Sequence, residues 1–154
     1  MKFKGPMLIV KDIDKSKEFY TKILGVRVIS DLGENATLTG GLSLQTEESW
    51  SKFTGHSESF FDYGGNVSEY YFEEENFENF INRIENENIE FVGEVTTMSW
   101  GQKVIRFYDP DKHIIEVGED LSVMMKRLYE DGLSIDELVE KTFLKKSMIE
   151  RMLK

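Results

Sequence analysis

The chain contains no cysteine, and this absence excludes several chemistries at once. A disulfide framework, a thiolate zinc site, an iron–sulfur cluster and a cysteine nucleophile all require that residue. Positive charge is also scarce, because 19 Lys and Arg stand against 29 Asp and Glu, a formal net charge of −10. Binding to phosphate backbones or anionic lipid needs a positive contact face, so this balance argues against nucleic-acid and membrane partners.

Long hydrophobic runs are missing as well. The apolar run nearest the N-terminus, residues 7–10, is too short for the core of a signal peptide, and no segment approaches the length that spans a bilayer. We therefore expect a soluble, cytoplasmic protein. The 154 residues, 40% of them hydrophobic and 11 of them Phe, are enough for one folded domain with a sizeable core.

The composition changes near residue 120. Residues 1–119 carry the whole net charge of −10, whereas residues 120–154 hold seven basic and seven acidic side chains. Before this point apolar residues recur in short strand-like runs, and after it they recur at helical spacing. The pattern predicts an α+β domain over residues 1–119 and a helical tail over residues 120–154.

Within residues 1–119 one order of elements occurs twice. In the first module, about 1–46, a strand at 3–10 precedes a helix that opens at Asp12 and ends at Gly25, followed by strands at 26–30, 36–39 and 42–46. In the second module, 67–119, a strand at 67–73 precedes a helix, followed by strands at 89–96, 103–109 and 114–118. We predict two βαβββ modules, each with its last strand antiparallel to its neighbours and a helix on its outer face. The connector, residues 47–66, shows no clear periodicity.

One motif follows the first strand of the first module, and a second motif runs into the last strand of the second module. The opening motif is D-x-x-x-S-x-x-F-Y, and the closing motif is D-P-D-x-H-x-I-E; they comprise Asp12, Ser16, Phe19, Tyr20, Asp109, Pro110, Asp111, His113, Ile115 and Glu116. In order and spacing they resemble the vicinal oxygen chelate superfamily, which includes glyoxalase I, fosfomycin- and bleomycin-resistance proteins and extradiol dioxygenases. The resemblance implies the glyoxalase/bleomycin-resistance/dioxygenase fold, a small-molecule ligand and a homodimer.

The resemblance also implies a metal site, built in metal-using members from the first and last strands of each module. It places Glu116 and Glu69 in the second module and Gln45, or Ser43 one pleat away, in the first. The remaining position falls on Gly5, which has no side-chain ligand, and neither His56 nor His113 occupies a ligand position. A divalent ion such as Ni, Zn, Mn or Mg would then have at most three protein ligands.

Strand alternation points to further site residues. If Glu116 faces the concave side of the sheet, then Arg106 and Tyr108 share one face of the preceding strand. Arg106 could receive an anionic ligand or simply balance Glu69 and Glu116. Tyr71 is expected in the cavity wall, and Trp100 is either an aromatic over the cavity mouth or a loop anchor.

The tail looks like a helix-turn-helix. Ser134 is a suitable N-cap with Glu137 three residues later, and a further helix begins at Lys145. Because the tail is neutral, we expect a helical appendage rather than a DNA reader. The side chains expected to pack on the body or a dimer mate are Leu133, Leu138, Phe143, Ile149 and Leu153.

Three functions follow as hypotheses. The first is a protein that binds a small molecule, with an anion among the options, in a cup formed by the paired modules, with metal-dependent lyase or isomerase chemistry in which Glu116 moves a proton. The second is a non-catalytic binder of the bleomycin-resistance kind. The third is a ligand sensor that acts through the tail.

Overall fold

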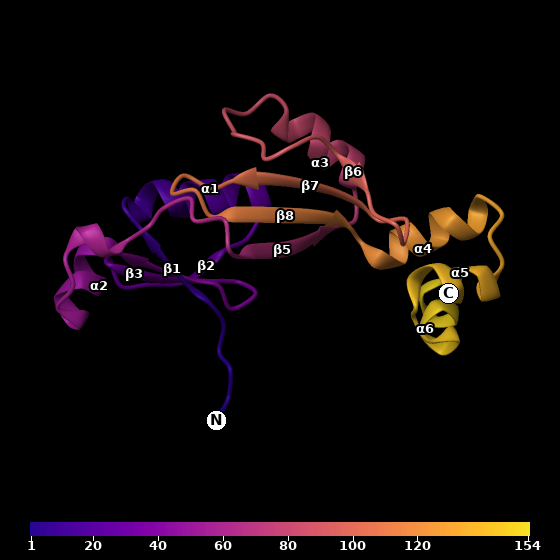
Figure 1. Cartoon of the computed structure of the whole chain (residues 1–154), viewed down its shortest axis with the longest axis horizontal. Helices are drawn as coiled ribbons and strands as arrows, with labels where there is room; N and C mark the ends of the chain where they lie inside the picture. The colour runs from indigo at the N-terminus through magenta and orange to yellow at the C-terminus, as the bar shows by residue number, and fades with distance from the viewer. The chain divides into compact units, whose positions relative to one another are not determined.

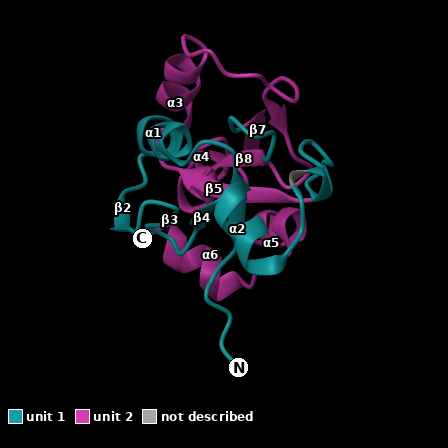
Figure 2. Cartoon of the chain, turned by 90° about the vertical axis from the view of Figure 1, so that its left-hand side faces the viewer, with its two compact units in different colours: residues 1–67, 109–113 teal, residues 68–108, 114–154 magenta. Residues whose placement is uncertain are grey.

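A computed structural model of the protein describes residues 1–57 and 59–154, and of residue 58 the backbone alone. The chain divides into two compact units, residues 1–67 with 109–113 and residues 68–108 with 114–154 (Figure 2). Each unit contains one four-stranded mixed sheet (Figure 1). The predicted α+β class with paired modules and C-terminal helices is confirmed.

The first unit has the strand order β1-β4-β3-β2. Its last strand, β4, runs antiparallel to β3 but parallel to β1, so the expectation that it opposes both neighbours is half wrong. The elements of this unit are β1 (Met7–Val10), α1 (Ile13–Leu24), β2 (Val28–Asp31), β3 (Asn35–Leu38), β4 (Ser43–Thr46), α2 (Glu47–Thr54) and the 3-10 turn η1 (Glu58–Phe60).

Local capping explains the first helix. The Asp12 side chain accepts hydrogen bonds from the backbone N–H groups of Asp14 and Lys15, and Gly25 closes α1 in the left-handed conformation at φ 66°. Such caps satisfy backbone groups that the helix leaves unpaired at its ends. Both ends of α1 therefore lie where the sequence predicts them.

The connector contains a helix that the sequence analysis missed. Thr46 caps α2 by accepting from the Ser49 N–H, and Gly55 ends it at φ 76°. The caps are visible in the sequence, but α2 is only eight residues long and buries a single residue, Ser49, so no apolar period marks it.

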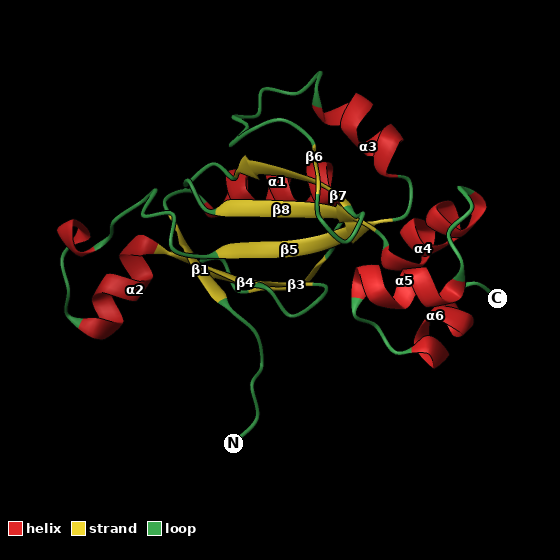
Figure 3. Cartoon of the chain, turned by 45° about the vertical axis from the view of Figure 1, so that its right-hand side comes forward, coloured by secondary structure: helices red, strands yellow, loops and turns green.

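The second unit repeats the topology with the order β5-β8-β7-β6, and again the last strand, β8, is parallel to the first strand and antiparallel to β7. Helix α3 packs against this sheet, with the centroids of the Phe80 and Phe107 rings 6.3 Å apart; α3 and β7 are labelled in Figure 3. The elements are β5 (Glu69–Glu74), α3 (Phe77–Ile84), β6 (Thr96–Thr97), β7 (Lys103–Tyr108), β8 (Ile114–Glu119), α4 (Leu121–Glu130), α5 (Ile135–Thr142) and α6 (Lys146–Met152).

The predicted strand at 89–96 is wrong. Only the two residues of β6 pair as a strand, together with a single bridge from Phe91 to Phe107. The backbone of this segment still forms hydrogen bonds with β7. In one of them, the Val92 N–H donates to the Arg106 carbonyl at 2.9 Å. Residues 91–97 are all exposed, so no burial holds them in a regular register.

The tail folds as predicted into helices, which bury their apolar faces against one another. The Ser134–Glu137 capping box is present. The hydrophobic cluster at the centre of these helices consists of Met124, Met125, Leu128, Leu138 and Ile149. Leu133 and Leu153 pack against this cluster. Phe143 ends α5 in the left-handed conformation and is 91% exposed, so it does not pack on the body; its packing on a dimer mate stays a prediction. By its contacts the tail belongs to the second unit, and the predicted boundary at residue 120 falls between β8 and α4.

Candidate functional site

The two faces of the second sheet differ in chemistry. One face is apolar and buried, with Ile105, Phe107, Ile115 and Val117 each at most 4% exposed. The alternate residues form the other face, which we call the polar face: Glu69, Tyr71 and Glu73 of β5, Ile114, Glu116 and Gly118 of β8, and Arg106 and Tyr108 of β7. The alternation predicted from the sequence therefore brings Glu116, Arg106 and Tyr108 to one face.

Arg106 joins two carboxylates on the polar face. Register places Arg106 opposite Glu116, and their side chains form an ion pair through Arg106 Nη2 and Glu116 Oε2. Arg106 Nε also donates to Glu69 Oε2 at 3.0 Å. One guanidinium thus spans three strands and holds both of the glutamates named as metal ligands.

Burial decides the ionisation of Glu116. Its side chain is 11% exposed, and this burial raises the pKa of the carboxyl above its ordinary value. Arg106 opposes the rise by favouring the carboxylate, whereas Glu69 adds to it as a like charge. Glu116 therefore takes up a proton at a higher pH than an ordinary exposed glutamate does.

Tyr71 lies beside this cluster, opposite Glu116 in the register of β5 and β8. Its hydroxyl donates to Glu73 Oε1 at 3.0 Å and accepts from Gln102 Nε2 at 2.6 Å. Burial and the nearby Glu73 raise the pKa of Tyr71 to about 12. The hydroxyl stays protonated at neutral pH, and 48% of the residue is exposed on the polar face.

Gln102 connects this face to the C-terminal helices through Tyr71 on one side and Trp100 on the other. It is 3% exposed, and its amide also donates to the Glu119 carbonyl at 2.8 Å. Its Oε1 accepts from Trp100 Nε1 at 3.0 Å, and the Trp100 ring packs against the helical cluster of the tail. Of the two roles open to Trp100, these contacts favour the loop anchor; its part in substrate binding stays a prediction.

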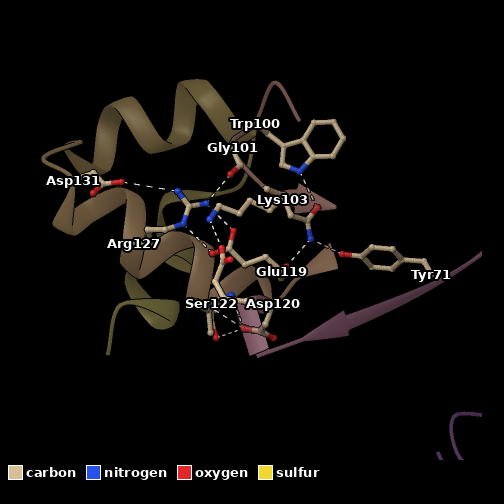
Figure 4. Close-up of polar contacts among 12 residues, drawn as sticks. Tyr71, Trp100, Gly101, Lys103, Glu119, Asp120, Ser122, Arg127 and Asp131 are labelled. Carbon is tan, nitrogen blue, oxygen red and sulfur yellow. Dashed lines mark hydrogen bonds and ion pairs between the residues drawn. The ribbon is translucent and has the colours of Figure 1, made fainter. Parts of the chain in front are cut away.

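Beyond Gln102, a buried ion pair attaches the same helices to the end of β8. Arg127 donates to both oxygens of Glu119, at 2.9 and 2.7 Å, and to the Gly101 carbonyl at 2.8 Å (Figure 4). Glu119 is 4% exposed, so this forked pair satisfies a carboxylate that would otherwise be buried alone.

Gln102, Glu119 and Gly118 were missed by the sequence analysis. A Cβ on Gly118 would meet Gln102 Nε2 at 2.7 Å and the Tyr71 hydroxyl at 3.0 Å, so only glycine leaves room for this network. No periodic or motif signal marks a single buried glutamine in a turn; the neighbouring W-G-Q-K run is the one local hint.

The two first-unit positions considered for the metal site, Gln45 and the ligand-free Gly5, make their contacts within that unit. Gln45 is 8% exposed, and its amide donates to Ser49 Oγ at the start of α2, at 2.9 Å. Gly5 precedes β1 and adopts φ 128°, where a Cβ would stand 2.0 Å from the Gly41 carbonyl oxygen. A side-chain ligand at Gly5 is therefore excluded by sterics.

This donor set does not fit a metal site with four protein ligands. Both acidic candidates are held by Arg106, and in residues 1–57 and 59–154 no group of three or more His, Asp or Glu side chains is placed to hold a metal ion. Carboxylates that already neutralise a fixed guanidinium would have to release it to bind a divalent ion.

The two sequence motifs meet at the turn of residues 109–113, which packs in the first unit. The buried Asp109 carboxylate accepts from the Tyr20 hydroxyl at 2.9 Å, from the backbone N–H groups of Asp111 and His113, and pairs with the His113 ring at 2.8 Å. The Asp111 carboxylate accepts from the Lys11 N–H, and burial raises the pKa of Asp111. These residues of the two motifs thus hold the fold together, whereas Glu116 of the closing motif lies on the polar face.

Comparison with known proteins agrees with this architecture. A family model described as the glyoxalase-like domain matches residues 3–122, and the chain belongs to this family. The C-terminal helices from residue 123 onward lie beyond the match. No curated protein matched the chain. The resemblance to the vicinal oxygen chelate superfamily is confirmed.

Solved structures with the same fold carry several descriptions. A protein of unknown function from Agrobacterium tumefaciens str. C58 is 34% identical, with a TM-score of 0.72 over 79% of this chain and 95% of that chain. A glyoxalase/bleomycin resistance protein/dioxygenase from Nocardioides is 22% identical, with a TM-score of 0.62 over 77% and 83%. A lactoylglutathione lyase from Agrobacterium tumefaciens is 18% identical, with a TM-score of 0.58 over 77% and 93%. The last two show the fold alone.

None of the helices formed by the described residues is both long and apolar enough to cross a bilayer.

Proposed function

We propose that this protein binds a small, uncharged molecule rich in hydrogen-bonding groups on the polar face of the second sheet, without a metal ion. The observation that carries this proposal is the Arg106 guanidinium bound to both Glu69 and Glu116. Arg106 acts there as a fixed internal cation between the first and the last strand of the module. This supports the non-catalytic binder of the sequence analysis.

The charge on the polar face sets the ligand class. An anion would have to compete with two carboxylates for the donors of Arg106, and Glu73 adds a further negative charge beside Tyr71. An uncharged hydroxyl or amide avoids this repulsion and can donate to these carboxylates. The sequence analysis considered an anionic ligand, and this proposal replaces it with an uncharged one.

The first experiment compares matched uncharged and anionic probes, lactamide with lactate and glucose with gluconate. Binding is followed by methyl NMR of Ile114, which lies on the polar face opposite Tyr108. We expect the uncharged members to shift the Ile114 methyl signal and Tyr71→Phe to weaken that shift several-fold. Stronger shifts from lactate and gluconate would overturn the ligand class.

The second experiment tests the absence of a metal. Protein purified without chelator is analysed for metal and then titrated with nickel, zinc and manganese by calorimetry. We expect well under one equivalent of metal and no tight binding. Stoichiometric metal that is lost in Glu116→Ala would overturn the proposal and support a site built from Glu69, Glu116 and Gln45.

A second candidate is lyase or isomerase chemistry in which Glu116 moves a proton. The observation in its favour is the buried carboxyl with a raised pKa, a common property of acid–base catalysts. The direct assay is lactoylglutathione formation, the activity named for one structural neighbour. Activity that Glu116→Gln abolishes would favour this candidate. The homodimer also stays a proposal, tested by light scattering.

A further inference from the structure

A cavity of about 590 Å³ opens on the apolar side of the second sheet. It lies between helix α3, which contributes Ile81 and is followed by the lining residue Glu85, and the irregular segment before β6, which contributes Phe91, Glu94 and Val95. Ile105 of β7 also lines it. Ile105 and Arg106 are consecutive strand residues and face opposite sides of the sheet, so this cavity is separate from the polar face.

The lining of the cavity is largely apolar and partly open to water. Ile105 is 4% exposed, but Phe91 and Val95 are 37% and 42% exposed. The cavity thus leads from an open mouth to the hydrophobic core between α3 and β7. A bound alkyl or aryl group would cover apolar surface that water now contacts, which favours binding. The volume lies within the range of small-molecule sites.

Charge at the cavity has one sign. Glu85, at the end of α3, and Glu94, in the segment before β6, belong to different elements and both line the space. No lysine or arginine is among the lining residues, and neither carboxylate has an ion-pair partner among the described residues. A ligand cation at the mouth would therefore meet two carboxylates among lining residues that include no lysine or arginine.

We propose that this cavity is a second binding site, for an amphipathic cation: a protonated amine that carries an alkyl or aryl group. The apolar group enters between Ile81, Phe91 and Ile105, and the ammonium group stays at the mouth near Glu85 and Glu94. The site requires neither the polar face nor a metal, so it stands apart from the function proposed above.

The test uses three probes with one apolar body and different charge: 3-phenylpropylamine, 3-phenylpropan-1-ol and 3-phenylpropanoate. Methyl NMR of the full chain follows Ile81 and Ile105 in the cavity and Ile114 on the polar face. We expect the amine to shift the Ile81 and Ile105 signals and to bind roughly five- to tenfold more tightly than the alcohol, with the carboxylate weakest. The Ile114 signal should not move.

Substitutions at the mouth test the role of charge. Glu85→Gln and Glu94→Gln should each reduce the preference for the amine over the alcohol several-fold and leave alcohol binding unchanged. Both side chains are exposed, so the fold should tolerate either change. Glu130→Gln, an exposed glutamate of α4, is the matched control.

Three outcomes would overturn the proposal: equal binding of the three probes, an amine preference that survives both substitutions, or shifts of Ile114 in place of Ile81 and Ile105. A response confined to Ile114 would concern the polar face alone, so failure of this proposal is distinguishable from failure of the proposed function.

Discussion

Arg106 is the residue on which the polar face depends. Its side chain is 31% exposed, and it binds Glu116, which is 11% exposed, and Glu69, which is 44% exposed. An ion pair with an exposed carboxylate contributes little to stability, whereas removal of one partner from a buried pair leaves an uncompensated charge. The pair with Glu116 should therefore account for most of the stability that Arg106 provides.

We predict that Arg106→Leu lowers the free energy of unfolding at pH 7 by about 2 kcal/mol. The pKa of Glu116 is already raised by burial, and loss of Arg106 raises it further. A carboxyl with a raised pKa in the folded state costs stability as the pH rises through the unfolded and then the folded pKa. The deficit should therefore shrink as the pH falls from the raised folded pKa toward about 4.5, and it should be smallest below that pH, where Glu116 is protonated in both states. Urea unfolding across this pH range measures it.

Arg106→Lys is the matched variant, because lysine keeps a point charge for Glu116 but cannot span both carboxylates. It should lose less than half as much stability as Arg106→Leu. Unchanged stability of Arg106→Leu at pH 7 would contradict the role assigned to the Glu116 pair.

Among the elements, strand β8 contains a glycine, Gly118, whose lack of a side chain leaves room for the contacts between Gln102 and Tyr71. Gly118 faces Gln102 and Tyr71, and a methyl group there would be 2.7 Å from Gln102 Nε2. Gln102 cannot easily move away, because it is buried and bound to the Glu119 carbonyl and to Trp100. The hydrogen bonds of Gln102 therefore depend on a glycine at position 118.

We predict that Gly118→Ala destabilises the fold by about 2 kcal/mol, the cost of inserting a methyl group into a packed site. It should also change the fluorescence of Trp100, observed alone in a Trp50→Phe background, since the indole loses its Gln102 partner. Gly93→Ala is the control, because its Cβ would meet nothing within 4 Å. A Gly118→Ala variant as stable as this control would show that Gln102 adapts freely.

On the scale of the whole molecule, the C-terminal helices extend the family's domain. The family model ends at residue 122, yet the following helices share a unit with the second sheet. Arg127, with its fork on Glu119 and its bond to the Gly101 carbonyl, and Trp100, in the helical cluster, provide the attachment. We therefore expect sheet and helices to unfold together.

Arg127→Lys tests this cooperativity, because lysine cannot donate to both oxygens of Glu119 in the planar fork. We predict a loss of about 1–2 kcal/mol, seen by hydrogen exchange as equal loss of protection for the amides of Leu138, Ile149 and β8. Arg151→Lys, on an exposed position of α6, should be silent. Faster exchange confined to α5 and α6 would show that the helices unfold independently.

Local features of this fold could be predicted from the sequence because they depend on residues close together in the chain. The helix ends at Asp12 and Gly25 and the Ser134–Glu137 capping box are of this kind. Strand alternation likewise predicted that Arg106 and Tyr108 share one face of their strand, and the register then pairs Arg106 with Glu116. The strand predicted at 89–96 is wrong, because the apolar residues of this segment lack the burial that holds a strand in register.

Only the tertiary structure decided which of these side chains meet. Tyr20 and Asp109 are 89 positions apart, Arg106 and Glu69 are 37 apart, and the partners of Gln102 come from β5, β8 and the Trp100 turn. Hydrogen bonds and ion pairs act over about 3 Å, so they depend on the register between strands that are distant in the chain. The sequence by itself determined the family, the repeated order of most helices and strands, and which residues alternate with Glu116 along its strand. Arg106 pairs with both Glu69 and Glu116 because strands β5, β8 and β7 lie side by side in this order.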